Sequence, residues 1–329
     1  MTEVLLDSLP KFATMLQMLV GFFAIIGILI FAVGLIRGRA QRPLAIIVLL
    51  GPSLLLVTVG LVFPAIRTII LSFKNSSSTD WVGFDNYGFI FTNPGQQRVL
   101  LNTLCWIIIA PIISTALGLV LSVIADQMKG KAEAIAKSLI FLPMAISFVG
   151  ASVIWNLVYA YRDPQYEQTG LFSQMVMWFG VDNPPNWILM EPWNNFFLMM
   201  IMIWVETGFA LVVLSASIKA IPKDVMEAAT LDGASGPRQF VFVTVPMIRG
   251  TLIVVYTTIL IAVLKVFDIV QTMTGGNFNT SVVANEMYNQ TFVQFNVGRG
   301  SALAVVLFVA VIPLIYYNIR QLRRERSER

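Results

Sequence analysis

Three charged residues lie inside long apolar stretches of the sequence: Glu206, Lys265 and Asp268. An unpaired charge at the centre of a bilayer costs at least ~2.5 kcal/mol, so such residues face other helices or a water-filled cavity. At a rise of about 1.5 Å per helical residue, Glu206 and Lys265 are expected at similar depths in neighbouring spans, with Asp268 one turn from Lys265. The pattern predicts either a structural ion pair between two spans or a polar path lined by charges.

Aromatic and hydroxyl side chains accompany these charges. Trp204, Thr207 and Phe209 flank Glu206, and Phe267 precedes Asp268. Aromatic faces combined with a few hydrogen-bonding groups are suited to receive a polar substrate. The candidate substrate-pathway residues are Trp204, Glu206, Thr207, Phe209, Lys265, Phe267 and Asp268.

Other reactive groups are scarce. The sequence has no histidine, and its single cysteine, Cys105, lies in an apolar stretch. The phosphate-binding spacing GxxxxGK[ST] does not occur, because Gly130 and Lys131 are followed by Ala132 where serine or threonine is needed. We therefore expect a non-catalytic chain with no metal site and no cofactor of its own. A membrane-embedded hydrolase would lack suitable catalytic groups.

The elements that must position these residues are membrane spans. Of the 329 residues, 57% are hydrophobic and 12% are charged, and the mean hydropathy is +0.77, far from a soluble composition. A spanning helix needs about 20 apolar residues. The sequence predicts an all-α, polytopic membrane protein with seven spans. Within a few residues they cover 12–36, 44–66, 99–125, 138–161, 196–220, 251–273 and 302–319.

The basic residues predict the orientation of these spans. Arg37, Arg39 and Arg42 follow the first span without an acidic residue, which makes that loop cytoplasmic and the N-terminus external. With alternating spans, fifteen basic residues fall on the cytoplasmic side, six fall outside, and Lys265 lies within a span. The C-terminal tail, 321–329, is then cytoplasmic and basic.

One polar segment, Ile221 to Pro246, interrupts the apolar runs on the predicted cytoplasmic side. Pro222 favours a helix start, and Gly233 is placed where a left-handed cap would end that helix. Gly236 and Pro237 can begin a second short helix that must stop or kink near Pro246. The segment is predicted to form a helix-turn-helix at the membrane face.

The same segment resembles a known family motif. Glu227, Ala228, Ala229, Gly233 and Pro246 occupy the EAA…G…LP spacing of the permease subunits of binding-protein-dependent ABC importers. The longer run EAATLDGASGPRQFVFVTVP is similar to the sugar-transporting branch, of maltose or α-glucoside type. The segments GFDNY at 83–87, WVETGF at 204–209 and FDIVQTMTGG at 267–276 agree with that branch.

The resemblance implies a role for this segment and a set of partners. In the family the segment is a coupling helix seated in a cleft of a cytoplasmic ATPase, where its glutamate pairs with a basic residue. The partners would be a second permease, two copies of the ATPase, which binds ATP and Mg²⁺, and an extracytoplasmic sugar-binding protein. Either this subunit or its partner permease holds the substrate. The ATPase-coupling residues are expected to be Glu227, Ala228, Ala229, Asp232, Gly233 and Pro246.

The resemblance also implies a division of the chain. Residues 1–43 would be an extra N-terminal transmembrane helix with its basic loop, and 44–320 a six-span permease core that contains the coupling loop 221–246. The protein is expected in the cytoplasmic membrane of a bacterium or archaeon. Transport would proceed by alternating access, driven by ATP-dependent closure of the ATPases.

Two alternatives stay open at this point. An ion-coupled secondary transporter would use Glu206, Lys265 and Asp268 as a relay and would need no ATPase. Within the importer class, another cargo such as glycerol phosphate would favour basic residues in the pathway, where Lys265 is available. A homodimer of permeases would replace the heterodimer if no second permease exists.

Overall fold

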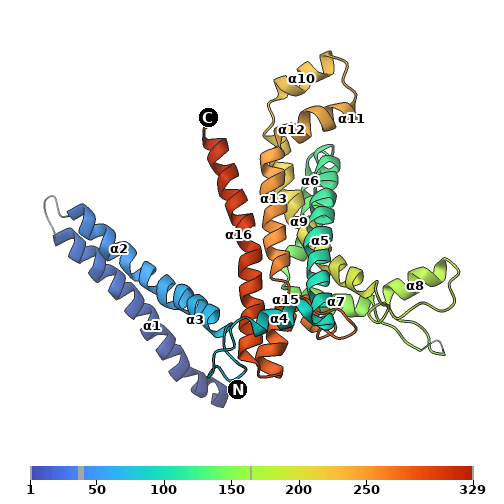
Figure 1. Ribbon diagram of the computed structural model, residues 1–329. Coiled ribbons are helices and arrows are strands. Elements are labelled where there is room, and N and C mark those ends of the chain that lie inside the picture. Colours follow the sequence, from blue (N-terminus) through green and yellow to red (C-terminus); the bar gives the residue numbers. More distant parts are fainter. Residues whose placement is uncertain (1, 36–40, 164, 328–329) are drawn as a thin grey trace. The chain divides into compact units, whose positions relative to one another are not determined.

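A computed structural model describes residues 2–35, 41–163 and 165–327 (Figure 1). The described residues are helical apart from loops and turns, and they contain no β-strand. Their one isolated bridge joins Lys74 to Trp81. The prediction of an all-α chain is confirmed.

The chain forms two compact units, residues 1–67 and 68–329. In the first unit, α1 (Thr2–Leu35) is followed by α2 (Gln41–Val57), which continues through the π-helical segment η1 (Thr58–Val62) into α3 (Phe63–Leu71), and the boundary between the units falls within α3. The apolar side chains described in this unit are largely exposed, as expected for a surface that contacts lipid. This unit also holds the second predicted span, and a domain boundary at residue 43 stays a prediction.

The second unit is built around α9 (Asn194–Lys219), the most buried of the long apolar helices. Its main neighbour is α5 (Pro94–Asp126). The two helices touch at Gly118, where an added Cβ would lie 2.3 Å from the Cβ of Ala210. Small residues at such crossings let helix backbones approach closely, and this supports a tightly packed membrane bundle.

Among the described residues, three continuous helical stretches are long and apolar enough to span a membrane, and two bent helix pairs raise the number to five. The first pair is α6 (Lys131–Phe141) with η2 (Leu142–Ala145), followed by α7 (Phe148–Val158) at 105°. The bend begins where Ile146 is extended and the Ser147 Oγ accepts a hydrogen bond from the Gly150 amide. The predicted span 138–161 is therefore not one straight helix.

The second pair joins the end of the coupling loop to α13 (Arg249–Leu264), with a bend of 72°. Apolar stretches of 10–17 residues also lie within α1, at Thr14–Ile28, and within α16 (Val297–Ser327), at Val297–Pro313. The part of the chain that the structure describes thus gives three to five spans by length and composition, and the count of seven is not confirmed. The bends in the two helix pairs interrupt apolar runs that are continuous in the sequence.

The predicted span 251–273 is wrong as a continuous helix. Helix α13 ends at Leu264, and α14 (Asp268–Met273) begins after a non-helical break. The break is stabilised by turn hydrogen bonds from the amides of Lys265 and Val266 to the carbonyls of Ala262 and Val263, at 3.2 and 3.0 Å.

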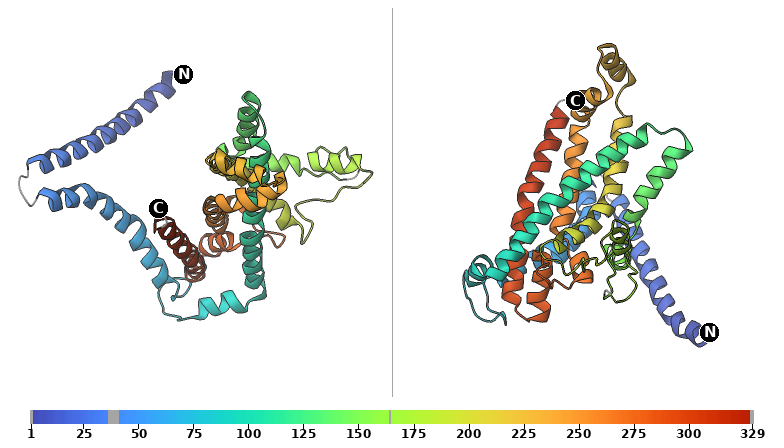
Figure 2. Two further views of the ribbon diagram at one scale, coloured as in Figure 1. Left: turned by 90° about the horizontal axis from the view of Figure 1, so that it is seen from above. Right: turned by 90° about the vertical axis from the view of Figure 1, so that its right-hand side faces the viewer.

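The remaining helices of the second unit complete its two ends. These are α4 (Asp85–Thr92), α8 (Leu171–Trp178), α15 (Val283–Tyr288), the π-helical η4 (Asn289–Val293) and α16 (Val297–Ser327). Figures 1 and 2 place α4 and α15 at the end opposite α10 (Lys223–Leu231) and α11 (Gly236–Gln239), and the C-terminal end of α16 on the side of α10 and α11. One end of this unit therefore carries α10 and α11, and the opposite end carries α4 and α15.

Candidate functional site

The coupling loop begins with α10 (Lys223–Leu231), for which Pro222 is the N-cap residue. The helix ends where the amides of Asp232 and Gly233 bond back to the carbonyls of Ala228 and Thr230, at 2.9 and 3.0 Å. Gly233 has a φ of +77°, so the predicted left-handed cap is confirmed. An added Cβ at Gly233 would meet no atom within 4 Å, and glycine is therefore needed here for its backbone conformation, not for close packing.

The second half of the loop starts with α11 (Gly236–Gln239), continues through η3 (Phe240–Thr244) and ends with α12 (Val245–Met247). Gln239 Nε2 donates a hydrogen bond of 2.8 Å to Thr230 Oγ1, which ties α11 to α10. Pro246 lies in the short helix just before the 72° bend, as the sequence predicts. The two short helices therefore form one connected element, held at both ends by long helices.

The tip of this element is exposed. Glu227, Ala228 and Asp232 are all accessible. Large apolar side chains also face outward, with Leu231 89% exposed and Phe242 74% exposed. Exposed apolar residues next to charges are typical of a protein docking surface.

A cavity of about 400 Å³ lies beneath the tip, between α10 and the ends of α5 and α9. Charged groups from three elements line it: Asp126 at the end of α5, Lys219 at the end of α9, and Lys223 and Glu227 in α10. Glu227 thus belongs both to the exposed tip and to this charged cavity.

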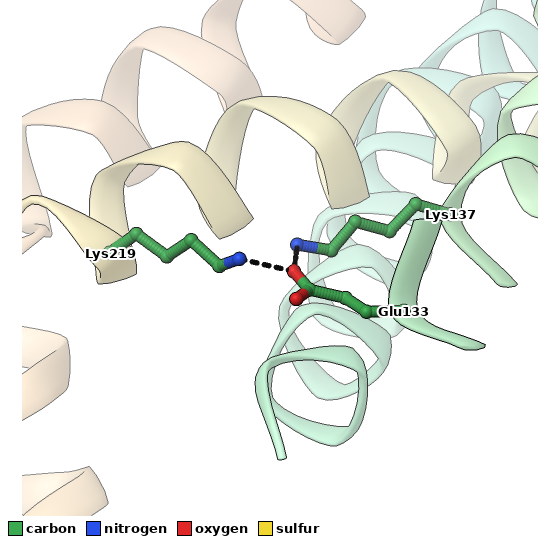
Figure 3. A network of polar contacts seen from close by, with 3 residues as sticks. All are labelled: Glu133, Lys137 and Lys219. Carbon is green, nitrogen blue, oxygen red and sulfur yellow. Dashed lines mark hydrogen bonds and ion pairs between the residues drawn. The ribbon is translucent and has the colours of Figure 1, made fainter. Parts of the chain in front are cut away.

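An ion-pair cluster braces the base of the loop (Figure 3). The Glu133 carboxylate, near the start of α6, pairs with Lys137 one turn further along and with Lys219 at the end of α9. Among the residues that the structure describes, these are the ion pairs found. Sequence reasoning used the two lysines only for orientation and missed Glu133. The i, i+4 spacing of Glu133 and Lys137 was a detectable signal, whereas the contact with Lys219 had none.

The three charges predicted within the membrane do not pair with one another. Glu206, on α9, is half-buried, while Lys265 and Asp268 are exposed. None of them takes part in an ion pair with a residue the structure describes. Lys265 caps the end of α13, so the one-turn helical spacing expected between Lys265 and Asp268 is lost.

The other predicted pathway residues fall into two places. Trp204 and Thr207 line a cavity of about 460 Å³ whose other walls are mainly apolar. The Trp204 ring packs edge-on against Trp155, with centroids 5.9 Å apart. The Phe267 ring instead packs against the Tyr288 ring, with centroids 5.1 Å apart, beside the break after α13. Sequence reasoning missed Trp155 and Tyr288 as neighbours, because both come from distant segments.

The chain is similar to known proteins over most of its length. Residues 118–326 match the family described as "Binding-protein-dependent transport system inner membrane component". The osmoprotective compounds uptake permease protein GgtC of Synechocystis sp. is 48% identical over 84% of this chain and 99% of its own length. The α-glucoside transport system permease protein AglF of Rhizobium meliloti is 44% identical over 84% of this chain and 82% of its own.

Solved structures extend the comparison to the fold. A chain of a bacterial ABC transporter involved in the import of the acidic polysaccharide alginate superposes with a TM-score of 0.74. The match covers 86% of this chain and 96% of that chain, at 21% sequence identity. This likeness shows that the two chains share a fold.

Proposed function

Because the chain belongs to the family of inner membrane components of binding-protein-dependent transport systems, we propose that it is the permease subunit of an ATP-driven importer of α-glucoside-like sugars. The family membership establishes a membrane permease. The proposal adds to this the cargo, the coupling residues and the complete set of partners.

The observation that carries the proposal is the exposed coupling loop. Its two short helices are joined by the Gln239–Thr230 hydrogen bond and enclosed between α9 and α13. A rigid element of this kind transmits a push from a partner as a rigid-body motion. We propose that Glu227, Ala228, Ala229, Asp232, Gly233 and Pro246 form the docking element for the ATPase, and that the ATPase binds ATP and Mg²⁺.

The path of the motion follows the helices that leave the loop. Helix α9 ends at Lys219, four residues before α10 begins, and Lys219 is held to α6 through Glu133. Movement of α10 toward the membrane would therefore displace α9 and α6 together. Because α9 is also the helix packed most extensively on α5, this would reshape the bundle that encloses the pathway.

The pathway proposal concerns two groups of residues. Trp204, Glu206, Thr207 and Phe209 lie on α9, while Lys265, Phe267 and Asp268 lie at the break after α13. Non-helical backbone at membrane depth is tolerated where it lines a cavity, and broken helices often form substrate sites. An aromatic surface with a few charged and hydroxyl groups suits a neutral sugar better than a phosphate ester.

The topology proposal retains seven spans, an external N-terminus and a cytoplasmic C-terminus. Its support is the distribution of basic residues and the position of the C-terminal end of α16 on the side of the coupling loop. The partners would be a second homologous permease, two ATPase subunits and an extracytoplasmic sugar-binding protein. Residues 1–43 would be an addition to a core at 44–320, with 321–329 as a basic tail.

Transport in proteoliposomes tests the proposal. The chain is reconstituted with its partner permease, its ATPase and its binding protein, and uptake of maltose is measured with and without ATP. We expect ATP-dependent accumulation that ionophores leave unchanged. Uptake driven by an ion gradient without ATP would contradict the proposal and support a secondary transporter.

The comparison with the Synechocystis permease makes a second cargo worth testing, since the name of that relative refers to osmoprotective compounds. Glycine betaine is offered in parallel with maltose. Uptake of glycine betaine alone would remove the sugar assignment while leaving the importer class intact.

A further inference from the structure

A buried carboxylate lies at the end of the second unit opposite the coupling loop. Glu286, in α15, is 7% exposed and sits beside Gln96, in the first turn of α5, and Gln290, in η4. The exposed fractions of the two glutamines are 7% and 2%. All three side chains are therefore removed from solvent by this chain alone.

The hydrogen bonds of this cluster converge on one oxygen. Gln96 Nε2 donates to Glu286 Oε1 at 2.8 Å, and Gln290 Nε2 donates to the same atom at 2.7 Å. The amide oxygens of both glutamines are buried, and neither accepts a hydrogen bond from any residue the structure describes. A buried acceptor without a partner is costly, so two such oxygens beside a carboxylate need an explanation.

The cluster also lacks a compensating positive side chain. Within the described residues, the ion pairs involve Glu133 and not Glu286. Arg299, near the start of α16, places its guanidinium over the ring of Phe89, 3.7 Å from the centroid. A carboxylate removed from water without a positive partner is strongly disfavoured.

The surroundings make that cost larger. Val99 and Val283, each three residues from a member of the cluster, belong to a buried apolar cluster with Ile90, Ala302 and Leu303. A low-dielectric shell strengthens the attraction of any cation for the carboxylate. The same shell disfavours a net charge on the occupied site. A ligand whose charge neutralises the carboxylate is therefore favoured.

We propose that Glu286, Gln96 and Gln290 bind a monovalent alkali-metal cation. Carboxylate and amide oxygens are the ligands that hard cations prefer. One positive charge balances the single carboxylate, whereas a divalent ion would leave an excess charge in an apolar shell. The ion would join the start of α5 to α15 and to η4, where the wider π-helical turn positions Gln290.

The site would stabilise the end of the bundle opposite the coupling loop. Its test measures neither uptake nor ATP hydrolysis, so a failure of this site can be distinguished from a failure of the proposed function. The measurement is thermal unfolding of the purified protein with its partner subunits in detergent, followed by tryptophan fluorescence. Sodium chloride is compared with N-methylglucamine chloride at equal ionic strength.

We expect sodium to raise the midpoint of unfolding by about 3 °C, and the effect to saturate as for a single site. The variant Glu286→Gln should lose this dependence. Glu167→Gln, which removes the same charge from an exposed loop position, should keep it. Equal midpoints in the two salts for the unaltered protein would overturn the proposal, as would a sodium effect that Glu286→Gln retains.

A second measurement covers the case in which Glu286→Gln does not fold. Crystals of the unaltered protein are soaked in thallium(I), which replaces alkali cations and scatters anomalously. A peak among Glu286, Gln96 and Gln290 would support the site. The absence of such a peak would overturn the proposal and leave a proton or an ordered water as the partner of these oxygens.

Discussion

Lys219 and Glu133 form an ion pair at the junction between α9 and the coupling loop. Lys219 is the last residue of α9, and Glu133 lies in the first turn of α6. The pair therefore connects two helices that are distant in sequence, immediately before the element proposed to contact the ATPase. We expect it to keep α6 and α9 moving as one body.

Charge exchange tests this connection. Glu133→Gln should lower uptake per ATP hydrolysed, because Lys137 and Lys219 are left facing each other without a carboxylate. Glu133→Lys and Lys219→Glu should each reduce that ratio, and the double variant should recover it, since the exchanged carboxylate would again lie between two ammonium groups. ATP hydrolysis and maltose uptake are measured in the same proteoliposomes. Failure of the double variant to recover would show that the contact does not act through charge.

Reversal of the charge at Glu227 should abolish ATP-coupled uptake. If Glu227 pairs with a basic group of the ATPase, Glu227→Lys should weaken the contact by about 2 kcal/mol or more, which is about 30-fold in affinity. The measurement is co-purification of the ATPase together with uptake, at equal amounts of inserted protein. Asp224→Lys is the matched control, because Asp224 is exposed on the same helix but does not line the charged cavity. Equal losses in both variants would contradict a specific role for Glu227.

Gly233 should be sensitive to the smallest substitution. A φ of +77° costs a residue with a Cβ about 1–2 kcal/mol, so Gly233→Ala should reorient the tip and weaken ATPase binding by about 5- to 30-fold. Gly236→Ala is the control, since Gly236 begins α11 and an added Cβ there meets no atom within 4 Å. Binding is measured by titration of the ATPase against the reconstituted permeases. Unchanged ATPase binding in Gly233→Ala would show that docking does not require glycine at this position.

Lys265 tests the pathway proposal. Lys265→Met should lower the rate of uptake by about tenfold if the ammonium group contacts the cargo, the effect of losing one charge-assisted hydrogen bond of about 1.5 kcal/mol. Lys265→Arg retains the charge and should be less affected. Protein level and ATPase co-purification should stay constant in both. Transport equal to that of the unaltered protein in Lys265→Met would rule out a pathway role for this residue.

Much of the coupling loop could be predicted from the sequence, because its conformation depends on local rules. Pro222, Gly233 and Pro246 act on their own backbone or on the adjacent turn. Gly233 and Pro246 are placed as these rules predict, and Pro222 lies one residue before the predicted first helical position, at the N-cap. The helical class follows from the apolar runs in the same way. A bilayer leaves no other regular structure for segments of that length.

The contacts between distant segments were decided by the tertiary structure. The pairing of Glu133 with Lys219, the break at Lys265 and the contact of Gln96 with Glu286 have no local signature. Apolar periodicity is the same whether a helix continues or bends, and a carboxylate in the sequence does not indicate which helix will face it. Packing places these groups, because the energy of each contact depends on distances that only the folded chain defines.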